Sequence, residues 1–160
     1  MAFSVSFDKH IADNKLVVTS RFNAPLKSVW KAFTDAQVLD KWWGPKPYKA
    51  VTEKMDFTEH GRWFYYMVSP QGEKTWSLFD FQKIEPLKYF DGLDAFADEK
   101  GNPKTDSPRL KWQNSFSEEN GVTTVVNTLQ GEGLKVIIDM GFEEGYRMGL
   151  TQLNELLQKN

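Results

Sequence analysis

The hydrophobic residues of this chain change their period once, and that change constrains the fold more than any other feature. Between residues 48 and 129, apolar and polar side chains alternate in six segments, as in strands with two unlike faces. After Gly131 and Gly133 the period becomes helical. The apolar stripe of this last segment consists of Phe142, Tyr146, Leu150, Leu153 and Leu157. A sheet covered by a long C-terminal helix predicts the α+β class.

Turn residues between the alternating segments set the limits of the predicted strands. The expected strands cover residues 48–57, 62–68, 74–84, 88–96, 110–116 and 122–129. The connections contain Gly, Pro and Asn, for example at Asn120-Gly121, and these residues favour tight turns. We therefore expect an antiparallel, curved sheet.

The N-terminal part predicts a short edge segment over residues 3–7, a strand over residues 16–22 and two short helices. Asn23 suits the N-cap of the first helix and Pro25 its first turn. The apolar face of this helix consists of Leu26, Val29, Trp30 and Phe33. Asp35 can cap the second helix, which we expect to end at Gly44-Pro45.

The length and composition fit one domain over residues 1–160 with a substantial core. The chain has 12 Phe, 6 Trp and 5 Tyr, and each ring can bury about 150–250 Å². These rings could fill a core or line a cavity. The net charge of −2, without a run rich in Lys and Arg, argues against a nucleic-acid partner.

Several chemistries are absent from the sequence. The chain has no cysteine, which excludes disulfides, thiolate nucleophiles and Cys-ligated zinc. The N-terminal residues lack the apolar segment of a signal peptide, and no run approaches the roughly 20 apolar residues of a membrane span. We expect a cytoplasmic protein without cofactor or metal. The acidic residues Asp91, Asp94, Asp98 and Glu99 are interpreted as a solvated loop rather than a cation site.

Four segments resemble the activator of heat-shock protein 90 ATPase homologue-like family, part of the START-like, birch-pollen-allergen-like (SRPBCC) superfamily. They are FNAPLKSVWKAFTDAQVLDKWWGP, GRWFYYMVSPQGEKTWS, DAFADEKGN and MGFEEGYRMGLTQLNELL. The match runs from about residue 16 to residue 157. It implies a helix-grip fold with an internal cavity, used in the superfamily for lipid transport, polyketide cyclisation or hormone sensing. ATPase activation is not expected, because the eukaryotic co-chaperone behind the family name carries a further N-terminal domain.

Two predicted strands supply the first candidate cavity residues. On strand 62–68, Trp63, Tyr65 and Met67 share a face that we expect under the long helix, with solid core packing as the alternative. On the next strand we place Trp76, Leu78 and Asp80 on the cavity face. A buried Asp80 would have a raised pKa and could anchor a polar group of a ligand or donate a proton. Alternatively, Asp80 faces solvent or pairs with a cross-strand Lys or Arg.

A third strand and the last helix complete the candidate set. Trp112 and Asn114 share a face, and the amide needs a partner from a ligand, the backbone or water. A glycine ridge, Gly141, Gly145 and Gly149, either leaves cavity volume or admits a close neighbour. Phe142 and Tyr146 flank this ridge and would contact a ligand. We expect Trp42 to fill the core and Trp43 to lie at the cavity portal.

No catalytic residue is predicted. The two histidines, His10 and His60, belong to none of the common catalytic motifs. We expect a binding module for a small apolar or aromatic molecule, lipids included. The alternatives are a cyclase- or hydratase-like enzyme that uses Asp80, Tyr65 or Tyr146 as acid or base, and a co-chaperone-like protein-binding module. A homodimer and a chaperone partner stay open.

Overall fold

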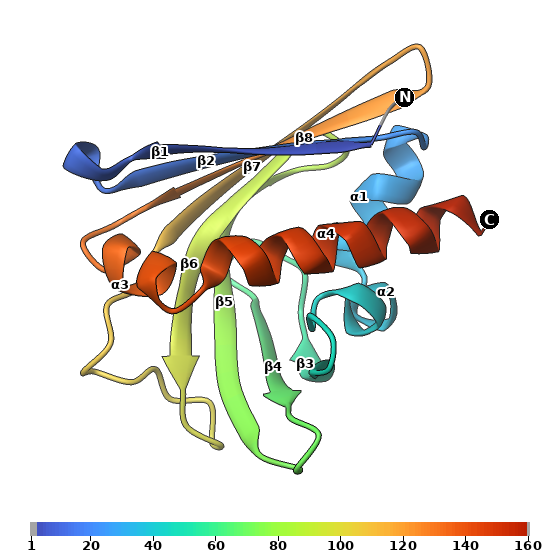
Figure 1. Ribbon diagram of the computed structural model, residues 1–160. Coiled ribbons are helices and arrows are strands. Elements are labelled where there is room, and N and C mark those ends of the chain that lie inside the picture. The colour runs from blue at the N-terminus through green and yellow to red at the C-terminus, as the bar shows by residue number, and fades with distance from the viewer. Residues whose placement is uncertain (1–2, 160) are drawn as a thin grey trace.

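Within residues 3–159, the computed structural model shows an eight-stranded antiparallel sheet that bends around a long C-terminal helix (Figure 1). The ends of the predicted domain, residues 1–2 and 160, lie outside the described residues. The strand order is β1-β2-β8-β7-β6-β5-β4-β3. The strands are β1 (Ser4–His10), β2 (Lys15–Phe22), β3 (Lys49–Met55), β4 (Arg62–Val68), β5 (Lys74–Glu85), β6 (Tyr89–Ala97), β7 (Lys111–Glu119) and β8 (Val122–Gln130).

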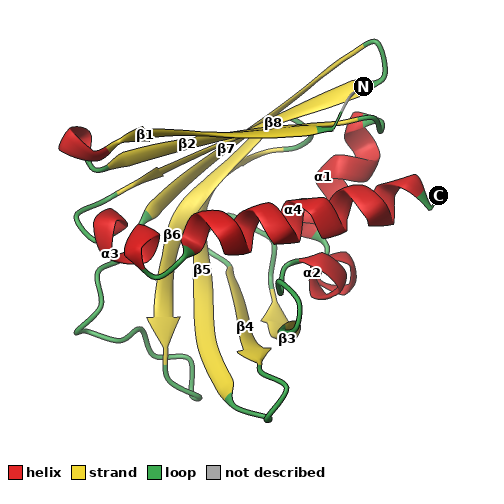
Figure 2. Cartoon of the chain, viewed as in Figure 1, coloured by secondary structure: helices red, strands yellow, loops and turns green. Residues whose placement is uncertain are grey.

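The helices lie on the concave side of this sheet (Figure 2). They are α1 (Leu26–Thr34), α2 (Ala36–Trp42), α3 (Leu134–Asp139) and α4 (Phe142–Gln158), and a short 3-10 turn spans Ile11–Asp13. The predicted α+β helix-grip fold is confirmed. No helix in the described part of the chain is long and apolar enough to cross a membrane.

Acidic side chains accept hydrogen bonds from the first backbone N–H groups of both short helices, but only α2 has a side-chain cap of its own. Asp35 caps α2, because its carboxylate accepts hydrogen bonds from the backbone N–H of Gln37 at 2.9 Å and of Val38 at 3.3 Å. The predicted cap of α1 by Asn23 is wrong. That helix starts after Pro25. Its first N–H group, that of Leu26, has no partner within the helix and donates to the Glu118 carboxylate of β7 at 3.1 Å. The hairpin of β7 and β8 thus helps to hold α1.

The predicted C-terminal helix is divided in two by Gly141. This residue has a φ of 94°, in the left-handed region that glycine adopts without strain, and it separates α3 from α4. Gly141 is therefore the N-cap of α4 and not part of a glycine ridge along it. The break lets α3 turn away from the axis of α4 (Figure 1).

One buried side chain connects α4 to the end of α2 and the segment after it. The Gln152 amide N–H groups donate to the carbonyls of Trp42 at 3.1 Å and Gly44 at 2.9 Å, and its oxygen accepts from the Lys46 N–H at 2.9 Å. Trp42 is fully buried, and its indole N–H donates to the Ala32 carbonyl at 2.8 Å. The expectation that Trp42 fills the core is confirmed.

A second apolar cluster lies on the opposite, convex face of the sheet. It contains Leu78, Ala95 and Ala97, with Phe64 and Trp76 packed against it. Residues 98–109 fold over this face: the Lys104 N–H donates to the Phe96 carbonyl at 2.8 Å, and the Gly101 carbonyl accepts from Arg62 at 2.8 Å. Both faces of β5 are therefore covered.

Glycine substitutions test the bend of the sheet. A Cβ at Gly92 of β6 would lie 2.2 Å from the Asp80 carbonyl oxygen, so we expect Gly92→Ala to lower the free energy of unfolding by about 1–3 kcal/mol or more. A Cβ at Gly145 of α4 would meet its nearest neighbour, Pro45, at 3.8 Å. Gly145→Ala, the matched control, should raise the free energy of unfolding by up to about 1 kcal/mol.

Urea unfolding followed by tryptophan fluorescence measures both changes. Equal effects of the two substitutions would contradict the close approach of β5 and β6 at Gly92.

Candidate functional site

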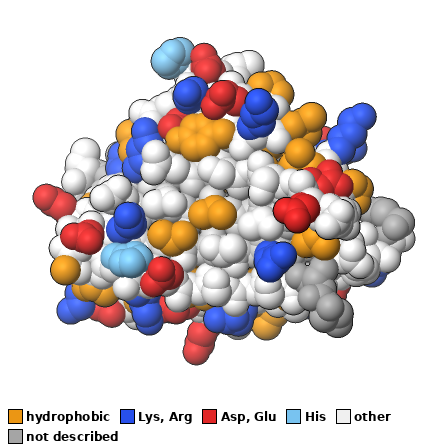
Figure 3. Space-filling model, turned by 90° about the horizontal axis from the view of Figure 1, so that it is seen from above, with side chains coloured by type: hydrophobic (Ala, Val, Ile, Leu, Met, Phe, Trp, Pro, Cys, Tyr) orange, Lys and Arg blue, Asp and Glu red, His pale blue; other side chains and the backbone are white. Residues whose placement is uncertain are grey.

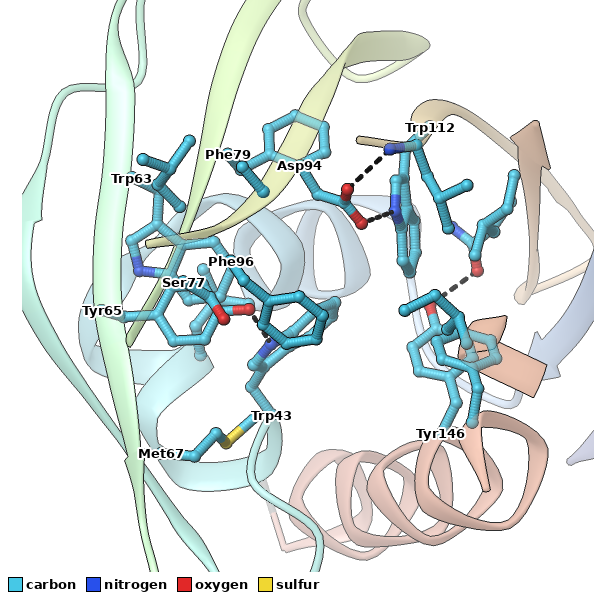
Figure 4. Close-up of a pocket in the computed structure, with 18 of the residues that line it drawn as sticks. Trp43, Trp63, Tyr65, Met67, Ser77, Phe79, Asp94, Phe96, Trp112 and Tyr146 are labelled. Carbon is cyan, nitrogen blue, oxygen red and sulfur yellow. Dashed lines mark hydrogen bonds between the residues drawn. The ribbon is translucent and has the colours of Figure 1, made fainter. Parts of the chain in front are cut away.

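A cavity of about 290 Å³ lies between the concave face of the sheet and α4. Strands β4 to β8, the segment after α2 and the first turns of α4 contribute to its wall. Its size is near the lower end of small-molecule pockets, which are roughly 300–1,000 Å³. The wall is mostly apolar and rich in aromatic residues, and Figure 4 shows the rings of Trp43, Trp63 and Trp112 around the open space.

Most of the candidate residues surround this cavity. Its wall includes Trp43, Trp63, Tyr65, Met67, Leu78, Trp112, Asn114, Phe142, Gly145 and Tyr146. Trp76, Asp80 and Gly149 lie outside it. Leu78 borders the cavity while belonging to the convex cluster.

The predicted inward face of β5 is wrong. Trp76, Leu78 and Asp80 do share a face, but it is the convex one, where the Trp76 ring stacks on Phe64 at 5.0 Å between centroids. Besides Leu78, the cavity is lined from β5 by Thr75, Ser77, Phe79 and Phe81, none of which was a candidate. Both faces of β5 carry large apolar side chains, because residues 98–109 cover the outer one. The alternation of residue types along β5 therefore does not indicate which face points into the cavity. A shift of one residue in the strand register would exchange the two faces.

Asp80 forms an ion pair on the convex face and is not the cavity carboxylate. It lies opposite Arg62 in the β4–β5 register, pairs with that guanidinium, and accepts from Arg109 Nη2 at 2.7 Å. Desolvation raises the pKa of Asp80, but the hydrogen bonds and charges of the two arginines outweigh it and lower the pKa below its ordinary value. This is the cross-strand pairing that the sequence left open.

The carboxylate in the cavity is Asp94, which sequence reasoning assigned to a solvated loop. Asp94 lies opposite Phe79 in the β5–β6 register. Its Oδ1 accepts from the Leu110 N–H at 2.8 Å, and its Oδ2 accepts from the Trp112 indole N–H at 2.9 Å. Burial raises the pKa of Asp94, against the opposing effect of these two donors and of the Arg109 charge. Residues two apart in a strand share a face, so Phe96 lies on the same side of β6 as Asp94 and also lines the cavity. This spacing was the feature of the sequence that could have indicated an inward carboxylate.

Trp43 and Tyr65 form a hydrogen-bonded pair in the wall. The Trp43 indole N–H donates to the Tyr65 hydroxyl at 3.0 Å, and the Tyr65 ring stacks on Trp63 with 4.1 Å between centroids. Burial raises the pKa of Tyr65 to about 12. Trp43 is half-buried and lies within 6.0 Å of Trp112 and 5.9 Å of Tyr146, ring centroid to ring centroid. It is thus part of the aromatic wall as well as a candidate portal residue.

A chain of buried amides connects α4 to the sheet. The Tyr146 hydroxyl donates to Asn127 Oδ1 at 2.7 Å, and Asn127 Nδ2 donates to Asn114 Oδ1 at 2.7 Å. Asn114 Nδ2 in turn donates to the Phe90 carbonyl at 3.2 Å. Asn114 therefore has protein partners for its amide. Burial raises the pKa of Tyr146, which keeps this hydroxyl protonated at neutral pH.

The helical glycines divide between the two alternatives considered for them. A Cβ at Gly149 would lie 3.2 Å from the Trp42 carbonyl oxygen, so this glycine admits close packing of the C-terminal end of α2. Gly145 borders the cavity, and a Cβ there would make only an ordinary contact with Pro45 at 3.8 Å. Residues 3–159 contain no group of three or more His, Asp or Glu side chains placed to hold a metal ion.

The Tyr146 hydroxyl can be tested by its removal. Tyr146→Phe leaves Asn127 Oδ1 without its donor in a buried site, so we expect a loss of about 1–3 kcal/mol in the free energy of unfolding. Tyr48→Phe is the matched control, because Tyr48 is exposed, and it should change the value by less than about 0.5 kcal/mol. An unchanged free energy of unfolding for Tyr146→Phe would contradict the chain of hydrogen-bonded amides.

The two carboxyls should titrate on opposite sides of the ordinary aspartate pKa of about 3.9. We expect Asp94 above this value and Asp80 below it, measured by carboxyl ¹³C shifts against pH. The folded protein then holds the Asp94 proton to higher pH than the unfolded chain does. The contribution of Asp94 to the free energy of unfolding therefore falls as the pH rises from the pKa of the unfolded chain to that of the folded protein. The reverse order of the two pKa values would contradict the assignment of their faces.

Solved structures of bacterial proteins share this fold over nearly their full length. A Mycobacterium smegmatis protein is 31% identical, with a TM-score of 0.85 over 98% of this chain and 97% of the other. An Arthrobacter aurescens protein is 28% identical, with a TM-score of 0.89 over 97% and 92% of the two chains. A Staphylococcus epidermidis protein is 29% identical, with a TM-score of 0.84 over 96% and 94%.

None of the curated proteins compared with this chain matches it. The model of one protein family, described as activator of Hsp90 ATPase homolog 1-like protein, matches residues 23–158. This range includes both short helices, the strands that surround the cavity and all of α4. The resemblance inferred from the four sequence segments is thereby confirmed. The chain belongs to the activator of Hsp90 ATPase homolog 1-like family.

Proposed function

We propose that this protein binds a small, largely apolar molecule in the cavity between the sheet and α4. The observation that carries the proposal is an open space of about 290 Å³ in the middle of the main hydrophobic core. Interiors are normally packed to the density of organic crystals, so a void of this size is a costly feature of a folded chain. A ligand that fills it would recover the lost contacts.

The chemistry of the wall supports an aromatic or short aliphatic ligand, small lipids included. Aromatic rings and aliphatic side chains line most of the space, and a few polar groups, among them Asp94, Tyr65 and Tyr146, are placed between them. Apolar walls with a small number of placed polar groups are the common pattern of small-molecule sites. The main polar groups already have protein partners, so the wall is held in place before a ligand enters.

A cyclase- or hydratase-like enzyme is the second candidate, and Asp94 favours it. A carboxyl whose pKa is raised by burial in a cavity is a recurrent feature of general acids and bases. In such an enzyme Asp94 would be the general acid or base, the role that the sequence analysis considered for Asp80. Tyr65 and Tyr146 would act as neutral hydrogen-bonding groups, since burial raises the pKa of both.

The co-chaperone-like alternative has less support. A protein-binding module needs a contiguous exposed apolar patch. On the face seen in Figure 3, hydrophobic side chains are scattered between charged and polar ones. The proposal therefore rests on the cavity.

A thermal-shift screen against small aromatic compounds, steroids and short lipids tests the proposal. A ligand at 100 times its Kd should stabilise the protein by roughly 2.7 kcal/mol. Ser77→Leu places a branched side chain into the cavity and should abolish the shift. Ser115→Leu, on an exposed position of β7, is the matched control and should retain it.

Two outcomes would contradict binding in this cavity. One is a stabilising compound whose effect survives Ser77→Leu. The other is the absence of any stabilising compound across the panel while both variants remain folded.

A further inference from the structure

The cavity has a marked charge asymmetry. Among the described residues that line it, Asp94 is the only acidic or basic side chain, and no Lys, Arg or His reaches the wall. Tyr65 and Tyr146 are neutral, because burial raises the pKa of both hydroxyls. A bound molecule therefore meets one carboxyl group and no cation.

The Asp94 carboxyl retains hydrogen-bonding capacity toward the cavity. Its two oxygens offer about four acceptor sites, and the structure uses two of them, one for the Leu110 N–H and one for the Trp112 indole N–H. Figure 4 shows the carboxyl between Phe79 and Trp112, open to the space that the rings enclose. A ligand group placed there can complete the set of donors.

The charge of Asp94 is balanced from behind the sheet and not from within the cavity. Arg109 donates from Nε to the Asp94 backbone carbonyl at 2.8 Å and from Nη2 to Asp80 at 2.7 Å. Arg62 also pairs with Asp80. The four side chains carry two positive and two negative charges when Asp94 is ionised, so the arginines favour the carboxylate while their N–H donors point to other acceptors.

We propose that the cavity selects molecules that carry a hydrogen-bond donor and no negative charge, with the donor directed at Asp94. This inference rests on the proposed binding function and names its ligand class. An anion would face a carboxylate in an apolar site without a compensating cation, which costs several kcal/mol of desolvation per ion. A ligand that carries only hydrogen-bond acceptors would give the Asp94 carboxylate no further hydrogen bond. An amine fits as well as an alcohol, because aromatic faces attract cations.

Four probes that share a naphthalene ring and one substitution position test the selection. They are naphthylmethanol, naphthylmethylamine, methoxymethylnaphthalene and naphthoate. Their Kd values are measured by isothermal titration calorimetry at mildly alkaline pH, which favours the carboxylate form of Asp94. We expect the alcohol and the amine to bind at least about tenfold more tightly than naphthoate, and the ether to bind more weakly than the alcohol.

Two variants assign the effect to Asp94. Asp94→Asn keeps the shape of the side chain and removes its charge, so the ratio of the naphthoate and alcohol Kd values should fall to less than about threefold. Asp8→Asn removes a charge from an exposed position of β1 and should leave the ratio unchanged. If Asp94→Asn does not fold, the ranking of the four probes on the wild-type protein decides.

The outcomes separate this inference from the proposed function. Naphthoate that binds as tightly as the alcohol would overturn the selection against anions and leave ligand binding intact. An ether that binds as tightly as the alcohol would overturn the role of the donor. If none of the four probes binds, the proposed function loses support and the inference falls with it.

Discussion

The placement of α4 on the sheet depends on hydrogen bonds made by two buried side chains of that helix. Gln152 binds three backbone groups, one in the last residue of α2 and two in the segment after it, and Tyr146 binds Asn127 of β8. Directly before the Tyr146 attachment, Gly145 leaves the helix surface without a side chain opposite Pro45. Because buried polar groups are costly when unpaired, neither attachment can shift without loss. The cavity is the volume that this fixed helix leaves beneath the bent sheet.

The fold could be predicted because periodicity and capping agree along most of the chain. The hydrophobic period changes from two residues to a helical one after Gly133, and the structure changes from strands to helices there. The predicted Asp35 cap of α2 is also present. The face of β5 could not be predicted, because both faces of that strand are apolar and the cover over the outer one comes from residues 98–109. The break at Gly141 was hidden by the helical spacing of the glycines around it.

The same limit explains the exchange of Asp80 and Asp94 as the cavity carboxylate. Each lies next to large apolar residues in a predicted strand, so local sequence gives the two almost the same context. Their environments differ only through pairing, since Arg62 lies opposite Asp80 and Phe79 lies opposite Asp94. Arg109 contacts both residues, at the carboxylate of Asp80 and the backbone carbonyl of Asp94. The ion pairs on the convex face thereby help to set the charge presented on the concave one.

Family membership fixes the scaffold of this protein, while the chemistry of its cavity depends on a few atoms. Proteins 28–31% identical share the bent sheet and the helix over almost their entire length. Shape alone would admit many apolar molecules of suitable volume. Discrimination requires a group that penalises the wrong partner, and a carboxylate without a cation in its cavity does so through charge. The proposed selectivity of the site therefore depends on Asp94 and on the arginines that keep their own donors outside the cavity.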